Sequence, residues 1–172
     1  MTLHAITVLG HDRPGIIAET TGRLADLGLN LEDSTMTLLR GHFAMTLVCA
    51  GDVAGAEIEA ALAPLAEDDS LTVTVREVPQ EQPATVDGSS WVLTVHGGDR
   101  PGIVSSIVGQ VAAVGGNITD LTTRLAGDLY LLVAELDLPA AADVAAVESA
   151  IQSVAASLGV GATLREAEAD DL

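Results

Sequence analysis

Apolar residues along the chain alternate between a strand spacing and a helix spacing, and the order is the same in both halves. The strand-like runs of the first half are residues 2–9, 30–39, 43–49 and 71–78. Its helical runs are residues 16–27 and 54–66. The second half has strand-like runs at 91–96, 117–125, 129–138 and 160–167, and helical runs at 103–114 and 140–158. Each half therefore reads strand, helix, strand, strand, helix, strand.

This order predicts an α+β fold with two ferredoxin-like domains in tandem. Each domain is expected to be a four-stranded antiparallel sheet with two helices on one face. The apolar residues at helical spacing should face the core: Ile16, Ile17, Leu24, Leu27, Ile58, Ala61, Leu62, Leu65, Ile103, Val104, Ile107, Val108, Val111, Val114, Val144, Val147, Ile151 and Val154. The helix-free face of a sheet needs water or a cover, and the apolar run 129–133 suits burial against a neighbour.

The division between the halves follows from composition. Residues 79–89 are polar and hold two prolines and a glycine, which is typical of a linker. We therefore expect domains at residues 1–78 and 90–167, and an acidic tail at 168–172. The first hairpin turn is expected at 40–42, so the 87-residue repeat places the second at 127–129. The sequence instead indicates a second turn at 126–128, one residue earlier.

One motif opens both halves. The segment His11-Asp-Arg-Pro-Gly-Ile16 returns 87 residues later as Gly98-Asp-Arg-Pro-Gly-Ile103, each time between a strand and a helix. Its prolines fit the first helical position, its aspartates fit a helix cap or an Asx turn, and its glycines allow close approach to backbone amides. Such a helix start suits a small carboxylate or phosphate. A strand-to-helix turn that binds nothing explains the same residues equally well.

The charge of the chain excludes several partners. Its net charge is −18, from 25 acidic residues against seven arginines and no lysine. This argues against direct nucleic-acid binding, and the scarcity of aromatic residues argues against base stacking. No apolar run is long enough to cross a bilayer, and the first residues do not resemble a secretion signal. We expect a cytoplasmic protein that does not bind membranes.

The sequence gives little support for a metal site, a cofactor site or a catalytic nucleophile. Cys49, the single cysteine, lies in an apolar strand-like run and is expected to be a small buried core residue. His4, His11, His42 and His96 do not have metal-ligand spacing. No serine, histidine and acid arrangement stands out. We therefore expect no enzyme activity, no metal and no cofactor.

The chain resembles two tandem ACT domains. The resemblance rests on the strand before Asp-Arg-Pro-Gly-Ile, the helix that ends in glycine, and the Asn-(Leu/Ile) entry to the next strand. It covers nearly the whole chain, and the stand-alone two-domain layout is most similar to the glycine-cleavage transcriptional repressor type. That resemblance implies a regulatory protein that binds an amino acid at interfaces between ACT domains. It also implies a homodimer and a regulated partner protein, in transcriptional control of amino acid or one-carbon metabolism.

The ligand-binding residues that the resemblance implies come from the loop and from the start of the second strand. In the first half they are Asp12, Arg13, Pro14, Gly15, Ile16, Asn30 and Leu31. In the second half they are Asp99, Arg100, Pro101, Gly102, Ile103, Asn117 and Ile118. The halves differ beside the loop, where His11 corresponds to Gly98, so the two sites need not be equivalent.

Other readings of the same residues stay open. One alternative is that Arg13 and Arg100 clamp a ligand carboxylate, and the other is that they are exposed arginines paired with surface acids. Asn30 and Asn117 would contact the ligand or serve only as turn residues. The whole chain would alternatively be a ligand-free interaction module. An acylphosphatase-like hydrolase, with an arginine after the first strand and an asparagine on the second, is the enzymatic alternative, although the glycine-rich anion cradle of that family is missing.

Overall fold

The computed structural model describes residues 1–67, 70–80 and 88–167. The chain divides into two compact units, Met1–Pro83 and Ala84–Leu172. Most of the predicted linker (residues 81–87) and the predicted acidic tail (168–172) lie outside the described residues. The exact domain boundaries therefore stay predictions.

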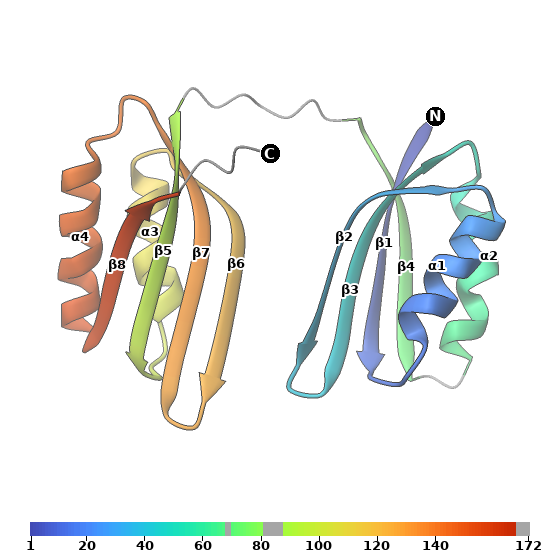
Figure 1. Cartoon of the computed structure of the whole chain (residues 1–172), viewed down its shortest axis with the longest axis horizontal. Helices are drawn as coiled ribbons and strands as arrows, with labels where there is room; N and C mark the ends of the chain where they lie inside the picture. Colours follow the sequence, from blue (N-terminus) through green and yellow to red (C-terminus); the bar gives the residue numbers. More distant parts are fainter. Residues whose placement is uncertain (68–69, 81–87, 168–172) are drawn as a thin grey trace. The chain divides into compact units, whose positions relative to one another are not determined.

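The first unit is one antiparallel sheet with its helices on one face (Figure 1). Its elements are β1 (Thr2–His11), α1 (Ile16–Asp26), β2 (Asn30–Leu39), β3 (His42–Gly51), α2 (Gly55–Leu62), a 3₁₀ turn η1 (Ala63–Ala66) and β4 (Leu71–Val78). The strand order is β2-β3-β1-β4, which places β1 and β3 in the middle and leaves β2 and β4 at the edges.

The second unit repeats this architecture (Figure 1). Its elements are β5 (Gly88–Gly98), α3 (Ile103–Ala113), β6 (Asn117–Ala126), β7 (Leu129–Pro139), α4 (Val144–Ser157) and β8 (Val160–Glu166). The strand order β6-β7-β5-β8 is that of the first unit. The predicted α+β, ferredoxin-like fold in two copies is confirmed. Strand β5 begins at Gly88, three residues before the expected Trp91.

Each unit has its own hydrophobic core between its helices and its sheet. The first core gathers residues from Ile6 to Leu71, and the second gathers residues from Leu93 to Leu164. Most of the predicted inward positions are buried, for example Ile58 on α2 and Ile151 on α4. The two cores share no residue, so each unit carries the packing that its own fold needs.

The helices bury a narrower stripe than the sequence predicts. Ile17 is 44% exposed, and Val104 and Val114 are each 36% exposed, although all three were expected to face the core. Thr20 on α1 and Ala155 on α4 are buried instead. A helix that lies on a flat sheet contacts it along one line of side chains, so residues beside that line stay partly open to water.

The two hairpins align, so the expected one-residue shift of the second turn is wrong. Strand β2 ends at Leu39 and β3 begins at His42, and 87 residues later β6 ends at Ala126 and β7 begins at Leu129. Two-residue turns with positive φ at the first position join both pairs, at Arg40 (+50°) and at Gly127 (+61°). The turn glycine occupies the second position in the first hairpin, at Gly41, and the first position in the second hairpin, at Gly127. This difference makes the second turn look displaced in the sequence.

The helix-free face of the second sheet carries exposed apolar side chains. Leu129, Leu131 and Val133 alternate along β7 with the buried residues Leu132 and Ala134. These three side chains are 53%, 38% and 37% exposed. Their expected burial against a neighbour stays a prediction. Among the described residues no helix is both long and apolar enough to cross a membrane.

Candidate functional site

The repeated loop connects the end of the first strand of each unit to its first helix. In both copies a glycine caps the helix: Gly15 before α1 and Gly102 before α3, each with φ of +91°. This left-handed conformation suits glycine and is strained for residues that carry a Cβ. The same loop geometry therefore needs the same residue twice.

The expected helix start is wrong in its details. Pro14 and Pro101 were predicted at the first helical position, but each lies before the capping glycine. In the described part of the chain no side chain caps α1 or α3, so Asp12 and Asp99 do not act as helix caps. A glycine cap leaves the first helix amides without a side-chain acceptor, and such amides are suited to an anion.

Each loop borders a pocket on the helix side of the sheet. The first, about 270 Å³, is lined by Asp12, Arg13, Gly15, Ile16, Ile17, Ala18, Met36 and Phe43. The second, about 360 Å³, is lined by Asp99, Arg100, Gly102, Ile103, Val104, Ser105 and Tyr130. A further pocket of about 410 Å³ shares Asp99 and Arg100 and extends to the β6–β7 turn. The two loop pockets therefore have matching positions, including an aromatic residue at Phe43 and Tyr130.

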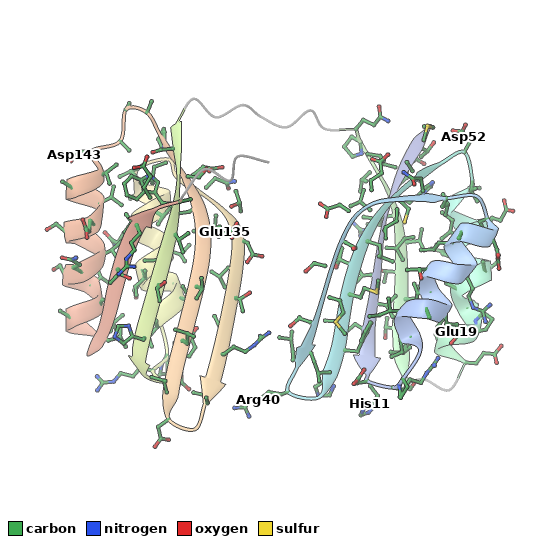
Figure 2. The ribbon with its side chains drawn as sticks, in the orientation of Figure 1. His11, Glu19, Arg40, Asp52, Glu135 and Asp143 are labelled. Carbon is green, nitrogen blue, oxygen red and sulfur yellow. The ribbon has the colours of Figure 1, made fainter. Side chains whose placement is uncertain are left out.

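In the first unit the loop arginine is held by an ion pair. Arg13 Nη2 lies 3.0 Å from Glu19 Oε2, and Arg23 Nη2 lies 3.0 Å from the other carboxylate oxygen of Glu19. Arg23 also donates a hydrogen bond to the carbonyl oxygen of Ala61, at 3.1 Å. The hydrogen bond from Arg13, followed by that from Arg23, lowers the pKa of Glu19 below its ordinary value. Arg13 thus matches the alternative of an arginine paired with a nearby acid; Glu19 is labelled in Figure 2.

In the second unit this ion-pair cluster is absent. Ser106 and Gln110 stand 87 residues after Glu19 and Arg23, so the helix offers Arg100 no carboxylate. The described residues make no ion pair or hydrogen bond with Arg100. Its guanidinium lies beside Gly159, where a Cβ would be 3.6 Å from the guanidinium carbon. The two loops therefore have the same shape and different charge surroundings.

The flank of the loops differs as expected. His11 and His42 face one another across the β1–β3 pair, with ring centroids 5.8 Å apart. At the matching positions of the second unit, Gly98 pairs with Leu129. His11 is labelled at the end of β1 in Figure 2.

The structure does not bring Asn30 and Leu31 to the loop of their own unit. Strands β1 and β2 both run antiparallel to β3, so His11 pairs with His42 while Asn30 pairs with Ala50. Eight residues along β3 separate these two points, about 26 Å at strand spacing. The loop and the start of β2 therefore lie at opposite ends of the sheet.

The second unit repeats this separation. Gly98 pairs with Leu129, whereas Asn117 pairs with Asp137 and Ile118 with Leu136. One small ligand cannot touch Arg100 and Asn117 of the same unit. The arginine and asparagine that an acylphosphatase-like reaction would need are thus not gathered at one point within either unit.

The starts of β2 and β6 have a shared irregularity of their own. The register shifts between Leu31 and Asp33, and again 87 residues later between Ile118 and Asp120. Such bulges bend an edge strand and redirect its side chains. Leu31 borders a pocket of about 500 Å³ that differs from the loop pocket and is lined by Ala18, Thr21, Gly22, Leu24, Ala25, Leu29, Leu31 and Cys49.

Cys49 is a buried core residue, as predicted, at 1% exposure. Burial raises the pKa of its thiol, and the charge of Glu32 adds a smaller effect in the same direction.

We expect native Cys49 to react with a disulfide reagent at least about tenfold more slowly than in the unfolded chain. Absorbance at neutral pH, with and without denaturant, measures both rates. Equal rates would contradict the buried position.

Sequence reasoning missed three features of this region. Gly10 and Gly97 lie one residue before the ends of β1 and β5, Phe43 and Tyr130 line the pockets, and Glu19 binds the loop arginine. The glycine pair and the aromatic pair each recur at a spacing of 87 residues, the same signal that revealed the loop. Glu19 and Arg23 have the four-residue spacing of a helical ion pair. Among the described residues, no group of histidine, cysteine, aspartate or glutamate could hold a metal.

Comparison with known proteins agrees with the duplicated fold. The model of the ACT domain matches residues 3–76 and again 90–164. The glycine cleavage system transcriptional repressor of Escherichia coli K12 is 30% identical over 162 residues, covering 89% of this chain and 84% of the repressor. A UPF0237 protein of Streptococcus pneumoniae is 45% identical over 47 residues, 27% of this chain and 53% of that protein.

Solved structures with a similar fold cover most of the chain. A crystal structure of an unknown protein from Galdieria sulphuraria has a TM-score of 0.78 and 28% identity, covering 96% of this chain and 98% of the other. A second structure, of a protein provisionally described as a glycine cleavage system transcriptional repressor, has a TM-score of 0.68. At 16% identity over 96% of this chain and 97% of that one, it supports the fold alone.

Proposed function

Because the chain belongs to the ACT domain family, as two ACT domains in tandem, we propose that it senses an amino acid and transmits the signal to a partner protein. It is a regulatory protein related to the glycine cleavage system transcriptional repressor. The observation that carries the proposal is the duplicated loop pocket, which has one arginine and one aspartate in each unit. The control of amino acid or one-carbon metabolism at the level of transcription is part of the same proposal.

The pocket chemistry suits a zwitterion. An amino acid carboxylate would meet the helix-start amides and the loop arginine, Arg13 or Arg100. Its ammonium group would meet the loop aspartate, Asp12 or Asp99, whose side chain is not used as a helix cap. Opposite charges on neighbouring loop residues thus match opposite charges on the ligand.

The strand-start residues belong to this proposal only if another ACT domain supplies them. Asn30 lies about 26 Å along the sheet from the end of β1, with Leu31 one residue nearer, and Asn117 and Ile118 repeat that separation. A ligand that contacts both groups would join the loop of one ACT domain to the β2-type strand of another, in this chain or in a second copy. Binding there favours one arrangement of domains, and this shift in population is the regulatory output.

A ligand-free interaction module is the second candidate function. The exposed row of Leu129, Leu131 and Val133 supports it, because apolar side chains on an open sheet face suit burial against a protein. A thermal-shift screen with the common amino acids separates the two candidates. A saturable rise in Tm with one amino acid, glycine or serine first, supports sensing. No rise with any amino acid supports the interaction module and contradicts sensing.

Placing a negative charge at a loop glycine should block binding. In Gly15→Asp and Gly102→Asp the new carboxylate would lie at the helix start, where the ligand carboxylate is proposed to bind. A Cβ has open space at Gly15 and its nearest neighbour at Gly102 is Ser106 Oγ, at 3.8 Å, so the variants should fold despite the positive φ. We expect amino acid affinity at the altered site to fall about tenfold or more, which corresponds to about 1.4 kcal/mol.

Asparagine variants are the matched control for this prediction. Gly15→Asn and Gly102→Asn add nearly the same volume and the same backbone strain without the charge. Calorimetric titration with glycine and with serine should show a much smaller loss for them. Unchanged affinity in both aspartate variants would overturn the assignment of the site to these loops.

A further inference from the structure

The clearest difference between the two loop pockets is whether the loop arginine is paired with a carboxylate. Both arginines follow the same aspartate and precede the same Pro-Gly pair. Arg13 has a carboxylate partner at 3.0 Å, whereas Arg100 has no such partner among the described residues. The matching position on the first helix of each unit differs too, with Glu19 in the first unit and Ser106 in the second.

Glu19 is positioned to imitate a ligand carboxylate. One of its oxygens accepts the hydrogen bond of Arg13 and the other accepts that of Arg23. Arg23 is in turn fixed to the carbonyl oxygen of Ala61, which ties the cluster to the second helix. The paired arginines lower the pKa of Glu19, so the carboxylate stays ionised at neutral pH.

We propose that Glu19 is a built-in competitor that occupies Arg13, so that an amino acid binds more tightly at the second ACT domain, through Arg100. The inference rests on the proposed sensing function and assigns its two sites different affinities. A ligand carboxylate in the first unit must displace Glu19, but in the second unit it meets the neutral Ser106. The repeat thus contains one ready site and one occupied site.

The expected difference is modest because the ion pair is partly exposed. The side chains of Arg13 and Glu19 are 40% and 33% exposed, and solvent weakens such pairs. Exposed pairs change equilibria by about one and a half- to fivefold each. Displacing Glu19 from its arginine and adding a second anion beside it should therefore reduce affinity roughly three- to tenfold.

A reciprocal exchange in the full chain tests the inference. Glu19→Ser, made together with Arg100→Ala to silence the second site, should bind glycine or serine roughly three- to tenfold more tightly than Arg100→Ala alone. Ser106→Glu, made together with Arg13→Ala, should bind more weakly than Arg13→Ala alone by a similar factor. Calorimetric titration gives each affinity, and circular dichroism shows that each variant is folded.

A second measurement needs no ligand. Phenylglyoxal modifies accessible guanidinium groups, and peptide mass spectrometry gives the rate at each arginine. Arg100 should react faster than Arg13 in the native protein, and Glu19→Ser should accelerate Arg13 without changing Arg100. Equal rates at both arginines in the unaltered chain would overturn the inference.

The outcomes separate this inference from the function it rests on. If glycine or serine binds and Glu19→Ser leaves the affinity unchanged, the inference is wrong and sensing stands. If neither amino acid binds to any variant, including Glu19→Ser, sensing and the competitor role are both wrong. Tighter binding in Glu19→Ser with weaker binding in Ser106→Glu supports both.

Discussion

Replacing Gly10 by alanine should lower the free energy of unfolding of the first unit by about 3 kcal/mol or more. A Cβ at this position would lie 2.0 Å from the carbonyl oxygen of Ser70 and 2.9 Å from Cα of Leu71. Both neighbours are backbone atoms, so no rotamer change can make room. The same carbonyl accepts the amide hydrogen of His11 at 2.9 Å, so relieving the clash would pull β1 away from β4 beside the loop.

Gly97→Ala repeats the test in the second unit. Its Cβ would lie 2.7 Å from Cγ1 and 2.9 Å from Cα of Val160, at the start of β8. Chemical denaturation followed by circular dichroism measures both variants. Gly22→Ala is the control, because a Cβ on α1 at that position meets open space. Gly22→Ala should stabilise the protein by about 0.5–1 kcal/mol. A Gly10→Ala variant as stable as the wild type would contradict the close approach of Gly10 to Ser70.

These glycines show which parts of the fold a sequence pattern can predict. The element order and the two-domain layout follow from periodicity, because strands and helices each need apolar residues at a characteristic spacing along the chain. The loop was found because it recurs. The close approach of Gly10 to Ser70 joins residues 60 positions apart, so it depends on the sheet pairing and not on local spacing.

The candidate site was predicted in parts, and its assembly was not. The Asp-Arg-Pro-Gly loop does border a pocket in each unit, but Asn30 and Asn117 lie at the other end of the sheet. The observed strand order β2-β3-β1-β4 shows this, because it makes β1 and β2 run in the same direction. Sequence also left open whether Arg13 pairs with an acid, and the structure identifies that acid as Glu19.

Truncating a core residue should destabilise one unit and spare the other. Ile6 on β1 and Leu93 on β5 occupy matching positions and are both fully buried, but they belong to separate cores. We expect Ile6→Ala and Leu93→Ala each to cost about 2–5 kcal/mol in the affected unit. The cavity left by the lost side chain weakens the packing of its own helices and sheet only, because the two cores share no residue.

The chain carries a separate reporter for each unit. Cys49, the one cysteine, is buried in the first core, and Trp91, the one tryptophan, lies on β5 with its indole N–H donating to Ser89 Oγ at 2.7 Å. In Ile6→Ala, thiol exposure should begin at lower denaturant while the tryptophan fluorescence transition stays in place. In Leu93→Ala the two probes should exchange behaviour. If both probes shift together in either variant, the units unfold as one, and a ligand bound to one domain would then stabilise the whole chain directly.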